Sequence, residues 1–287
     1  MLTPGTRVLS YLRMIKFSHS LFALPFAFSS AVLAAGGLPA TKKILWITMA
    51  MVAARSAAMG MNRVIDKEID AQNPRTKNRE IPTGVIPVAE AVAFIVLSSI
   101  IFCFSAHMLN PLCLKLSPLA LCIVFLYSYT KRFTWGAHLV LGVAIALAPL
   151  GAWIAIRGGI SWEALPLCVA VIFWLAGFDI LYALQDIEFD KAHKLYSIPQ
   201  RFGVRNSLYI ARVFHIITWI FLCITGRVFH MGIVYYIGMA VVAGLLIYEH
   251  RLVRPGDLTK LDMAFFNMNG YISIAVLVFI ALDKMAK

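Results

Sequence analysis

Long apolar runs, separated by short polar connections, repeat along the whole 287-residue chain. A helix needs about 20 consecutive apolar residues to cross the roughly 30 Å hydrocarbon core of a bilayer. The short alternating pattern of membrane β-barrel strands is absent, so we predict an all-α membrane protein. Nine transmembrane helices are expected, at residues 17–36, 43–64, 87–107, 112–130, 135–156, 162–185, 206–226, 230–250 and 262–283. The first run is longer than the apolar part of a signal peptide, so we interpret it as a retained span.

The composition supports this interpretation. Hydrophobic residues make up 61% of the chain and charged residues 14%, whereas about a quarter of the residues in soluble domains are charged. The net charge of +12 is concentrated in particular connections, which favours a role in membrane topology and in binding an anionic ligand over nucleic-acid binding. The five cysteines lie in apolar stretches without a CxxC pair, so neither a disulfide framework nor a zinc site is indicated.

The distribution of Lys and Arg predicts the orientation. The N-terminal segment and every second connection hold 17 of these residues, and the remaining connections with the C-terminal segment hold 7. Cytoplasmic segments carry the excess of positive charge. We therefore expect the N-terminus in the cytoplasm, the C-terminus outside, and an odd number of spans.

Acidic residues are concentrated at two places. The chain has 14 of them, and seven lie in or beside two short segments: Asp66, Glu68 and Asp70 in the first, and Asp179, Asp186, Glu188 and Asp190 in the second. Helical residues at i and i+4 share a face, so Asn62, Asp66 and Asp70 form one polar stripe, and Asp179, Tyr182, Asp186 and Asp190 form another. Stacked carboxylates repel each other unless a cation lies between them. The two stripes therefore predict a metal site at the cytoplasmic ends of the second and sixth spans.

Basic connections follow both stripes and favour magnesium with a diphosphate. Magnesium is usually held by one or two carboxylates together with substrate phosphates. The nearby cations are Arg75, Lys77, Arg79, Lys131, Arg132, Lys191, Lys194 and Arg201. An Ile-Pro pair and a glycine also follow each stripe, at 81–84 and 198–203. This weak repeat suggests two pseudo-repeated four-helix bundles plus one helix, forming a single domain over residues 1–287.

These motifs carry a resemblance to a known family. Asn-x3-Asp-x3-Asp at 62–70, Arg-Thr-Lys-Asn-Arg-x-Ile-Pro-x-Gly at 75–84, Tyr-Thr-Lys-Arg at 129–132 and Tyr-x3-Asp-x3-Asp at 182–190 are similar to those of the UbiA superfamily of intramembrane aromatic prenyltransferases. The stretch from Tyr182 to His193, followed by Ser-Ile-Pro-x-Arg-Phe-Gly, is most similar to the branch that transfers polyprenyl groups to 4-hydroxybenzoate.

The resemblance implies a chemistry and a set of site residues. A polyprenyl diphosphate would ionise with the help of Mg²⁺, and a ring carbon of an aromatic carboxylic acid would attack the allylic cation. Tyr182 would stabilise that cation through its ring face. The implied metal-holding residues are Asn62, Asp66, Asp70, Asp186 and Asp190, and the four aspartates and Tyr182 form the catalytic set. The implied substrate-binding residues are Asn62, Arg63, Arg75, Arg79, Lys131, Arg132, Lys191, Arg55 and Asp179.

Some alternatives stay open at this point. Arg55 lies on the face of Asn62, seven residues earlier, and either binds the carboxylate of the acceptor or neutralises the acidic cluster. The acceptor itself is either 4-hydroxybenzoate or a carboxylated dihydroxynaphthalene, as in menaquinone biosynthesis. A secondary transporter is the alternative of another class, since internal repeats and intramembrane polar residues are also found there. His138 and four other histidines outside the motifs are interpreted as interfacial or packing residues.

Overall fold

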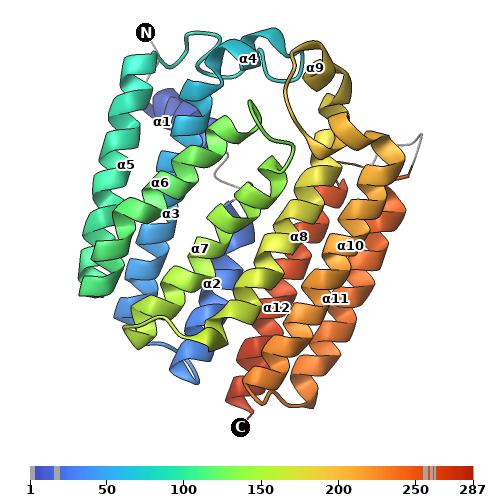
Figure 1. Ribbon diagram of the computed structural model, residues 1–287. Coiled ribbons are helices and arrows are strands. Elements are labelled where there is room, and N and C mark those ends of the chain that lie inside the picture. Colours follow the sequence, from blue (N-terminus) through green and yellow to red (C-terminus); the bar gives the residue numbers. More distant parts are fainter. Residues whose placement is uncertain (1–3, 16–19, 255–257, 259–260, 262, 287) are drawn as a thin grey trace.

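The computed structural model of the protein describes residues 4–15, 20–254, 258, 261 and 263–286. Helices and the turns between them form nearly all of this part of the chain (Figure 1). The main helices are α1 (Pro4–Met14), α2 (Ser20–Ala35), α3 (Thr41–Ile65), α4 (Lys67–Gln72), α5 (Val88–Leu109), α6 (Pro111–Thr130), α7 (Ala137–Arg157), α8 (Leu165–Ala183), α9 (Ile187–Ala192), α10 (Ile198–Val228), α11 (Ile233–Leu252) and α12 (Asn269–Met285). The short turns η2 (Trp162–Ala164) and η3 (Leu184–Asp186) flank α8, and the π-helical turn η4 (Met263–Met268) precedes α12.

Within the described residues, seven helical segments are long and apolar enough to cross a bilayer. They contain α3, α5, α6, α7, α8, α10 and α11. The first and last predicted spans coincide with the shorter helices α2 and α12, which have 16 and 17 residues; residues 17–19 and 262 of those spans lie outside the described part. The chain is therefore an integral membrane protein with multiple apolar helices.

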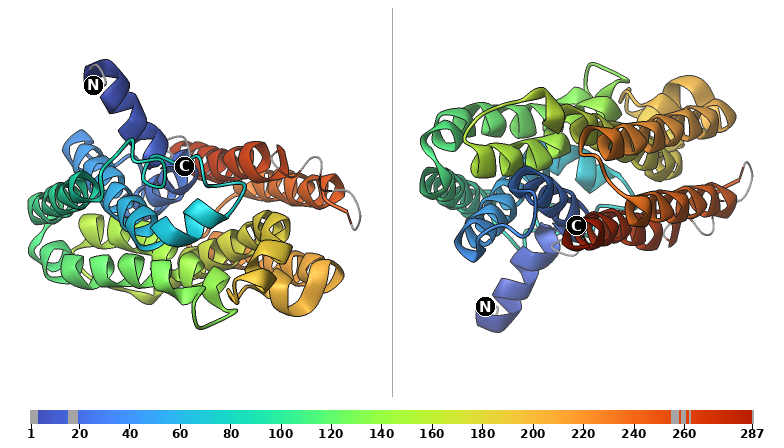
Figure 2. Two further views of the ribbon diagram at one scale, coloured as in Figure 1. Left: turned by 90° about the horizontal axis from the view of Figure 1, so that it is seen from above. Right: turned by 90° about the horizontal axis from the view of Figure 1, so that it is seen from below.

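Successive long helices pack side by side. The contacts run from α3 through α5, α6, α7, α8, α10, α11 and α12 to α2, and α2 also packs against α7 and α3. The views along the helices in Figure 2 show this arrangement, with α1 projecting away from the bundle. The largest buried cluster joins α2, α7, α8, α10, α11 and α12 around the fully buried Trp174. This core places α8, which carries the second acidic segment, in the interior of the bundle.

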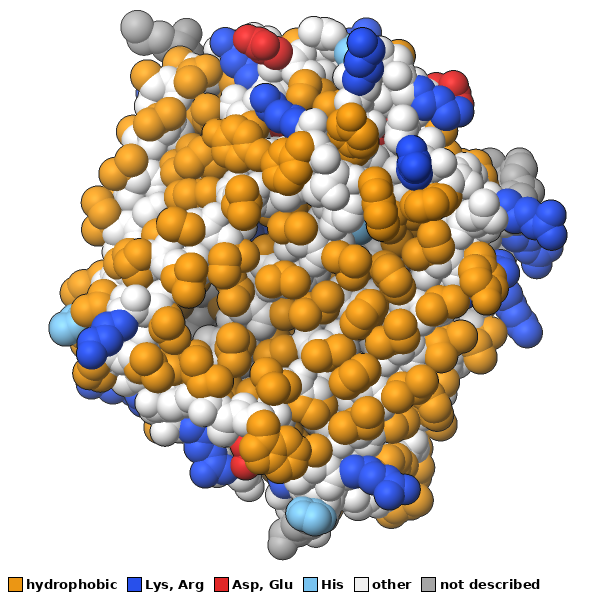
Figure 3. Space-filling model, viewed as in Figure 1, with side chains coloured by type: hydrophobic (Ala, Val, Ile, Leu, Met, Phe, Trp, Pro, Cys, Tyr) orange, Lys and Arg blue, Asp and Glu red, His pale blue; other side chains and the backbone are white. Residues whose placement is uncertain are grey.

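The polar connections that follow α3, α6 and α8 all lie at one end of the bundle. The short helices α4 and α9 cap this end (Figure 1). Helix α1 docks there as well, because Arg7 and Tyr11 both donate hydrogen bonds to Glu90 at the start of α5. The C-terminal end of α12 lies at the opposite end. On the face drawn in Figure 3, apolar side chains cover the middle and charged side chains gather towards the two ends, as expected for a membrane-spanning surface.

Candidate active site

The two acidic segments face one another across a cavity of about 240 Å³ at the α4 and α9 end of the bundle. Every predicted site residue except Lys191 lines this cavity. The upper part of the cavity, next to α4 and α9, is polar. The deeper part, towards the middle of the bundle, is lined by apolar side chains of α7 and α8. The residues brought together are Arg55, Asn62, Arg63, Asp66, Asp70, Arg75, Arg79, Lys131, Arg132, Asp179, Tyr182, Asp186 and Asp190.

The first wall keeps the predicted stripe even though the helix is interrupted. Asp66 has φ −90° and ψ 10°, so α3 ends before it and α4 begins after it. The backbone N–H groups of Asp66 and Asp70 still donate to the carbonyls four residues earlier, at 2.9 and 2.7 Å. The side chain of Asn62 donates to Asp66 Oδ2 at 2.8 Å. The i,i+4 register therefore survives the break, and the three oxygen-bearing side chains share one face.

The second wall is formed by α8, η3 and α9. Asp186 and Asp190 are both buried, whereas Glu188 points to solvent. Ser197, just before α10, donates to Asp190 Oδ2 at 2.8 Å and accepts the backbone N–H of Gln200. The same serine thus begins α10 as an N-cap and fixes the orientation of one cavity carboxylate.

Three carboxylates of the cavity pair with arginines. Arg75 donates to both oxygens of Asp186, at 3.0 and 2.6 Å, and so links the two motifs. Its guanidinium also lies 5.3 Å from the centre of the Tyr182 ring. Arg79 contacts both oxygens of Asp70 at 2.7 Å. The third pair is longer, with Arg132 3.5 Å from Asp66. These cations offset the repulsion that stacked carboxylates would otherwise suffer.

Asn73 is a site residue that the sequence interpretation missed. It is buried at the end of α4, where its side-chain Nδ2 donates to Asp186 Oδ1 at 3.3 Å and its side-chain Oδ1 accepts the backbone N–H of Arg75 at 2.9 Å. It therefore holds the first motif loop against the second motif. Its position directly before the Pro-Arg-Thr-Lys-Asn-Arg loop was the available signal.

The cavity has strong electrostatic effects on groups outside the spans. Burial raises the pKa of Asp66, and the neighbouring carboxylate of Asp70 raises it further. Burial alone would lower the pKa of Lys131, but the surrounding carboxylates, Asp190 foremost, outweigh it and raise that pKa. Asp66 thus holds a proton more readily than an ordinary aspartate, and Lys131 holds its charge more firmly than an ordinary lysine.

Two arginines of α3 have different surroundings. Arg63 is 3% exposed, and its Nε donates to the carbonyl of Met14 at 3.1 Å, which ties α1 to the cavity wall. Arg55 lines the deeper part of the cavity. Within the described residues its buried Nε has no hydrogen-bond partner, and Tyr127 lines the same cavity. Arg55 is therefore a cation available to an anionic ligand.

The donor set fits magnesium. No group of three or more His, Cys, Asp and Glu side chains capable of holding a metal occurs among the residues that the structure describes. The oxygen donors are instead divided between two walls: Asn62, Asp66 and Asp70 on one, and Asp186 and Asp190 on the other. Magnesium prefers oxygen ligands, retains water and takes up substrate phosphates, so a divided carboxylate set suits it better than an all-protein cage would.

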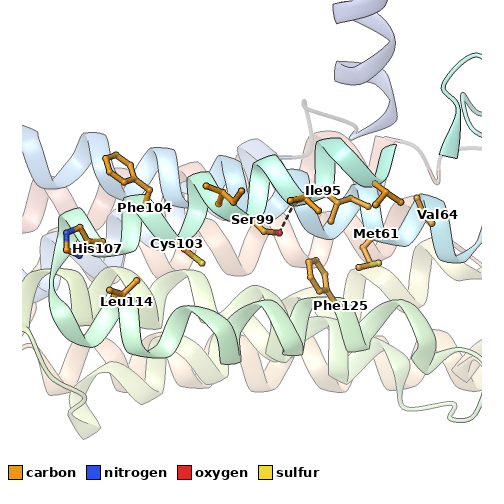
Figure 4. A pocket seen from close by; sticks show the side chains of 12 residues that line it. Met61, Val64, Ile95, Ser99, Cys103, Phe104, His107, Leu114 and Phe125 are labelled. Carbon is orange, nitrogen blue, oxygen red and sulfur yellow. Dashed lines mark hydrogen bonds between the residues drawn. The ribbon is translucent and has the colours of Figure 1, made fainter. Parts of the chain in front are cut away.

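Two other features lie outside this cavity. Lys191 is exposed on α9 and pairs with Glu188 at 3.3 Å. A separate groove of about 650 Å³ is formed by α3, α5 and α6, and the close view in Figure 4 shows the apolar side chains of Met61, Ile95 and Phe125 lining it. No carboxylate lines the groove, so the acidic cavity and not the groove is the candidate active site.

Comparisons with known proteins agree with this geometry. Residues 23–271 match the UbiA prenyltransferase family. The chain is 29% identical over 247 residues to a 4-hydroxybenzoate octaprenyltransferase of Vibrio campbellii, covering 86% of each protein. It is 28% identical to the Shewanella woodyi enzyme of the same name, covering 96% of each.

Solved structures show the same fold. The apo structure of a UbiA homologue from Aeropyrum pernix K1 superposes with a TM-score of 0.84 at 30% identity, covering 92% of this chain and 98% of that one. A UbiA homologue from Archaeoglobus fulgidus bound to DMAPP and Mg²⁺ gives a TM-score of 0.66 at 20% identity, covering 93% of this chain and 99% of that one. The match to the family extends over both acidic motifs and all the cavity residues, and the chain belongs to the UbiA prenyltransferase family.

Proposed function

We propose that the protein transfers a polyprenyl group from a polyprenyl diphosphate to a ring carbon of an aromatic carboxylic acid, in a Mg²⁺-dependent reaction of quinone biosynthesis. The observation that carries the proposal is a single cavity with two parts. Two carboxylate-bearing walls and several cations meet at its α4 and α9 end, and apolar side chains line it deeper in the bundle. Relatives named 4-hydroxybenzoate octaprenyltransferases, and a homologue structure holding DMAPP and Mg²⁺, support this assignment.

The upper cavity suits the diphosphate. Asn62 and the four cavity aspartates would hold Mg²⁺, which supplies positive charge to the departing diphosphate oxygens. Arg75 and Arg79, which pair with Asp186 and Asp70, would also bind the diphosphate oxygens. Lys131 lines the same cavity with its charge maintained. These residues bind and orient the leaving group, so they lower the barrier to breaking the allylic C–O bond.

The deeper cavity suits the acceptor and the allylic cation. Tyr182 lines the cavity, and the centre of its ring lies 5.3 Å from the guanidinium of Arg75. In the reaction, its ring face would stabilise the allylic cation. Trp174, Phe178 and Leu141 form apolar walls that limit the capture of the cation by water. Arg55 would bind the carboxylate of the acceptor. We propose 4-hydroxybenzoate as that acceptor; a carboxylated dihydroxynaphthalene presents the same group and is the alternative.

The membrane arrangement is part of the proposal. We infer nine spans, with α2 and α12 crossing the bilayer as the first and last, in two pseudo-repeated four-helix bundles plus one helix. We place the protein in a bacterial inner membrane with the cavity on the cytoplasmic side, where a water-soluble diphosphate headgroup and an aromatic acid are both accessible. The excess of Lys and Arg in the connections at that end supports this orientation.

The experiment is an assay of the purified protein in liposomes. It uses a polyprenyl diphosphate, Mg²⁺ and either 4-hydroxybenzoate or 1,4-dihydroxy-2-naphthoate, with products identified by mass spectrometry. We expect a C-prenylated acid that disappears with excess chelator. Exclusive prenylation of the naphthoate would replace the first acceptor by the second. Absence of any prenylated product, together with solute flux across the liposome membrane, would instead favour a transporter.

A matched pair of α9 variants tests the role of the carboxylate wall. Asp190→Asn should reduce the rate about 100-fold or more, because metal-ion stabilisation of charge is worth several kcal/mol. Glu188→Gln changes an exposed carboxylate two residues away and should leave the rate within about twofold of the unchanged protein, as expected for a surface substitution. Equal losses in the two variants would reject the assignment of Asp190.

A further inference from the structure

A buried histidine orients one cavity carboxylate that has no arginine partner among the described ion pairs. His138 lies near the start of α7 and is fully buried. Its Nδ1 is 2.6 Å from Asp179 Oδ2, on α8. The backbone N–H of Ile198 donates to His138 Nε2 at 3.3 Å. Because Nε2 accepts this hydrogen bond, Nδ1 carries the ring proton and donates it to Asp179.

The second motif loop, which is the connection between α9 and the start of α10 at residues 193–198, orients the His138–Asp179 pair. Ile198 is the first residue of α10, so its N–H is one of the donors that the helix itself leaves unused. The preceding residue, Ser197, donates to Asp190. Two adjacent residues of the Ser-Ile-Pro sequence therefore orient two different parts of the cavity. Ser197 orients Asp190, in the part of the cavity proposed to hold the diphosphate. Ile198 orients His138, which in turn orients Asp179.

Asp179 lies on the acceptor side of the cavity. It precedes Asp186 by seven residues, or about 10 Å along a helix. Arg55 precedes Asn62 by the same number of residues on the opposite wall. Tyr127 of α6 lines the same cavity as Asp179 and Arg55. A ring held by its carboxylate on Arg55 would therefore extend past Tyr127 towards Asp179.

The contacts of Asp179 leave it able to accept a proton. His138 donates to Oδ2 of Asp179. The side chain of Asp179 is 18% exposed and lines the cavity. Asp66, Asp70 and Asp186, in contrast, are each paired with an arginine. Lys131 and Arg75 line the same cavity from the loops that follow α6 and α4. Asp190, the other cavity carboxylate without an arginine partner among the described ion pairs, accepts a hydrogen bond from Ser197 beside Asp186. Under the proposed function, Asp179 would therefore be the carboxylate beside the acceptor.

We propose that Asp179 is the base that removes the ring proton of the acceptor and that His138 is its positioning residue. The inference rests on the proposed function. When the allylic C–O bond breaks, its electron pair leaves with the diphosphate, and the ring carbon then forms the new C–C bond. The C–H electron pair of that carbon returns to the ring, and its proton passes to Asp179. A base oriented by a second group in this way is a recurrent device for proton transfer.

The test compares acceptor carrying hydrogen with acceptor carrying deuterium at the reacting ring carbon. In the unchanged protein we expect an isotope effect close to one, because proton removal follows a slower ionisation. Asp179→Asn should lower kcat about 10²- to 10⁴-fold, the usual contribution of a general base. Its isotope effect should rise clearly above one, and KM for the polyprenyl diphosphate should stay unchanged.

Three further variants separate catalysis from structure. His138→Gln keeps a donor towards Asp179 and an acceptor towards Ile198, so it should retain more activity than His138→Leu. Asp186→Asn should lose activity without gaining an isotope effect, since it acts on ionisation. Asp179→Glu retains a carboxylate and should show a smaller isotope effect than Asp179→Asn, which keeps the test valid if the asparagine variant folds poorly.

The outcomes are distinguishable. Loss of activity in Asp179→Asn with an isotope effect still at one, or retention of activity within about tenfold, would overturn the assignment of the base. Absence of C-prenylated product with the unchanged protein would instead overturn the proposed function on which the inference rests.

Discussion

Among the described lining residues, Arg55 is the cation in the deeper half of the cavity, and under the proposed function its guanidinium would distinguish acceptors with a carboxylate from those without. We expect Arg55→Leu to raise KM for a carboxylated acceptor about 10- to 100-fold, because hydrogen bonds to charged groups contribute about 1.5–3 kcal/mol. KM for the polyprenyl diphosphate should change little. Steady-state kinetics with each substrate varied in turn measures both values.

Arg55→Lys is the control for charge. It retains the positive charge but lacks the planar pair of donors that matches a carboxylate. Its KM for the carboxylated acceptor should therefore lie between that of the unchanged protein and that of Arg55→Leu. If Arg55→Leu raised both KM values equally, Arg55 would serve to neutralise the acidic cluster instead.

The charge of Lys131 stabilises the folded protein in a way that depends on pH. Its pKa in the folded protein is raised above the ordinary value, since the carboxylates, Asp190 foremost, outweigh the effect of burial. A lysine of this kind contributes stability that is fully present below its unfolded pKa, about 10.4, and is lost as the pH rises through the folded pKa. Lys131→Gln should therefore lower the melting temperature by the same amount at pH 7 and pH 9. Thermal unfolding in detergent checks this, and a difference that vanished by pH 9 would contradict it.

At the scale of the elements, Gly203 bends α10 between the second motif loop and the membrane span. Its φ of 74° and ψ of 173° are accessible essentially to glycine alone. No neighbouring atom would contact an added Cβ, so the cost of Gly203→Ala is one of backbone conformation, about 1–3 kcal/mol. The melting temperature should fall, and activity should fall with it because Ser197 and Ile198 shift.

Gly244→Ala is the matched control. Gly244 lies within α11, has open space around it and does not have a positive φ. Alanine there should leave the melting temperature unchanged or raise it slightly, because glycine inside a helix costs about 0.5–1 kcal/mol relative to alanine. A similar drop in both variants would mean that the bend at Gly203 does not determine the stability of this region.

The two polar stripes show which part of the site helical periodicity can predict from the sequence. Spacing of four residues placed Asn62, Asp66 and Asp70 on one face, and the backbone hydrogen bonds of the broken helix preserve that face. The contribution of Asn73 and His138 was not predictable in the same way. Both act on partners 113 and 41 residues away, and such contacts depend on the packing of helices that a one-dimensional pattern does not specify.

For the molecule as a whole, apolar run length predicted the seven described helical segments that are long and apolar enough to cross a bilayer, because a bilayer imposes a minimum length on each span. The shorter helices α2 and α12 coincide with the first and last predicted runs, and their crossing of the bilayer stays a prediction. The ends were less predictable. The prediction began the seventh span at residue 206, whereas α10 starts at Ile198, since the polar first turns are stabilised by the Ser197 cap and not by apolar character. Lys191 was grouped with the site by its position in a motif, but α9 turns it outward to Glu188.

The two ends of the bundle differ in positive charge, and this difference predicts the orientation of the protein in the membrane. The end with α1 and the cavity carries most of the positive connections, so it should face the cytoplasm. Two exposed positions report on the two ends: Asn78 in the first motif loop, and Thr41 at the start of α3. In a background with the five native cysteines replaced by serine or alanine, Asn78→Cys should react with a membrane-impermeant maleimide in inverted vesicles and stay unlabelled in intact cells. Thr41→Cys should show the reverse pattern. Labelling of Asn78→Cys in intact cells would place the cavity outside, where the protein could not draw on cytoplasmic diphosphate, and would contradict both the orientation and the proposed donor.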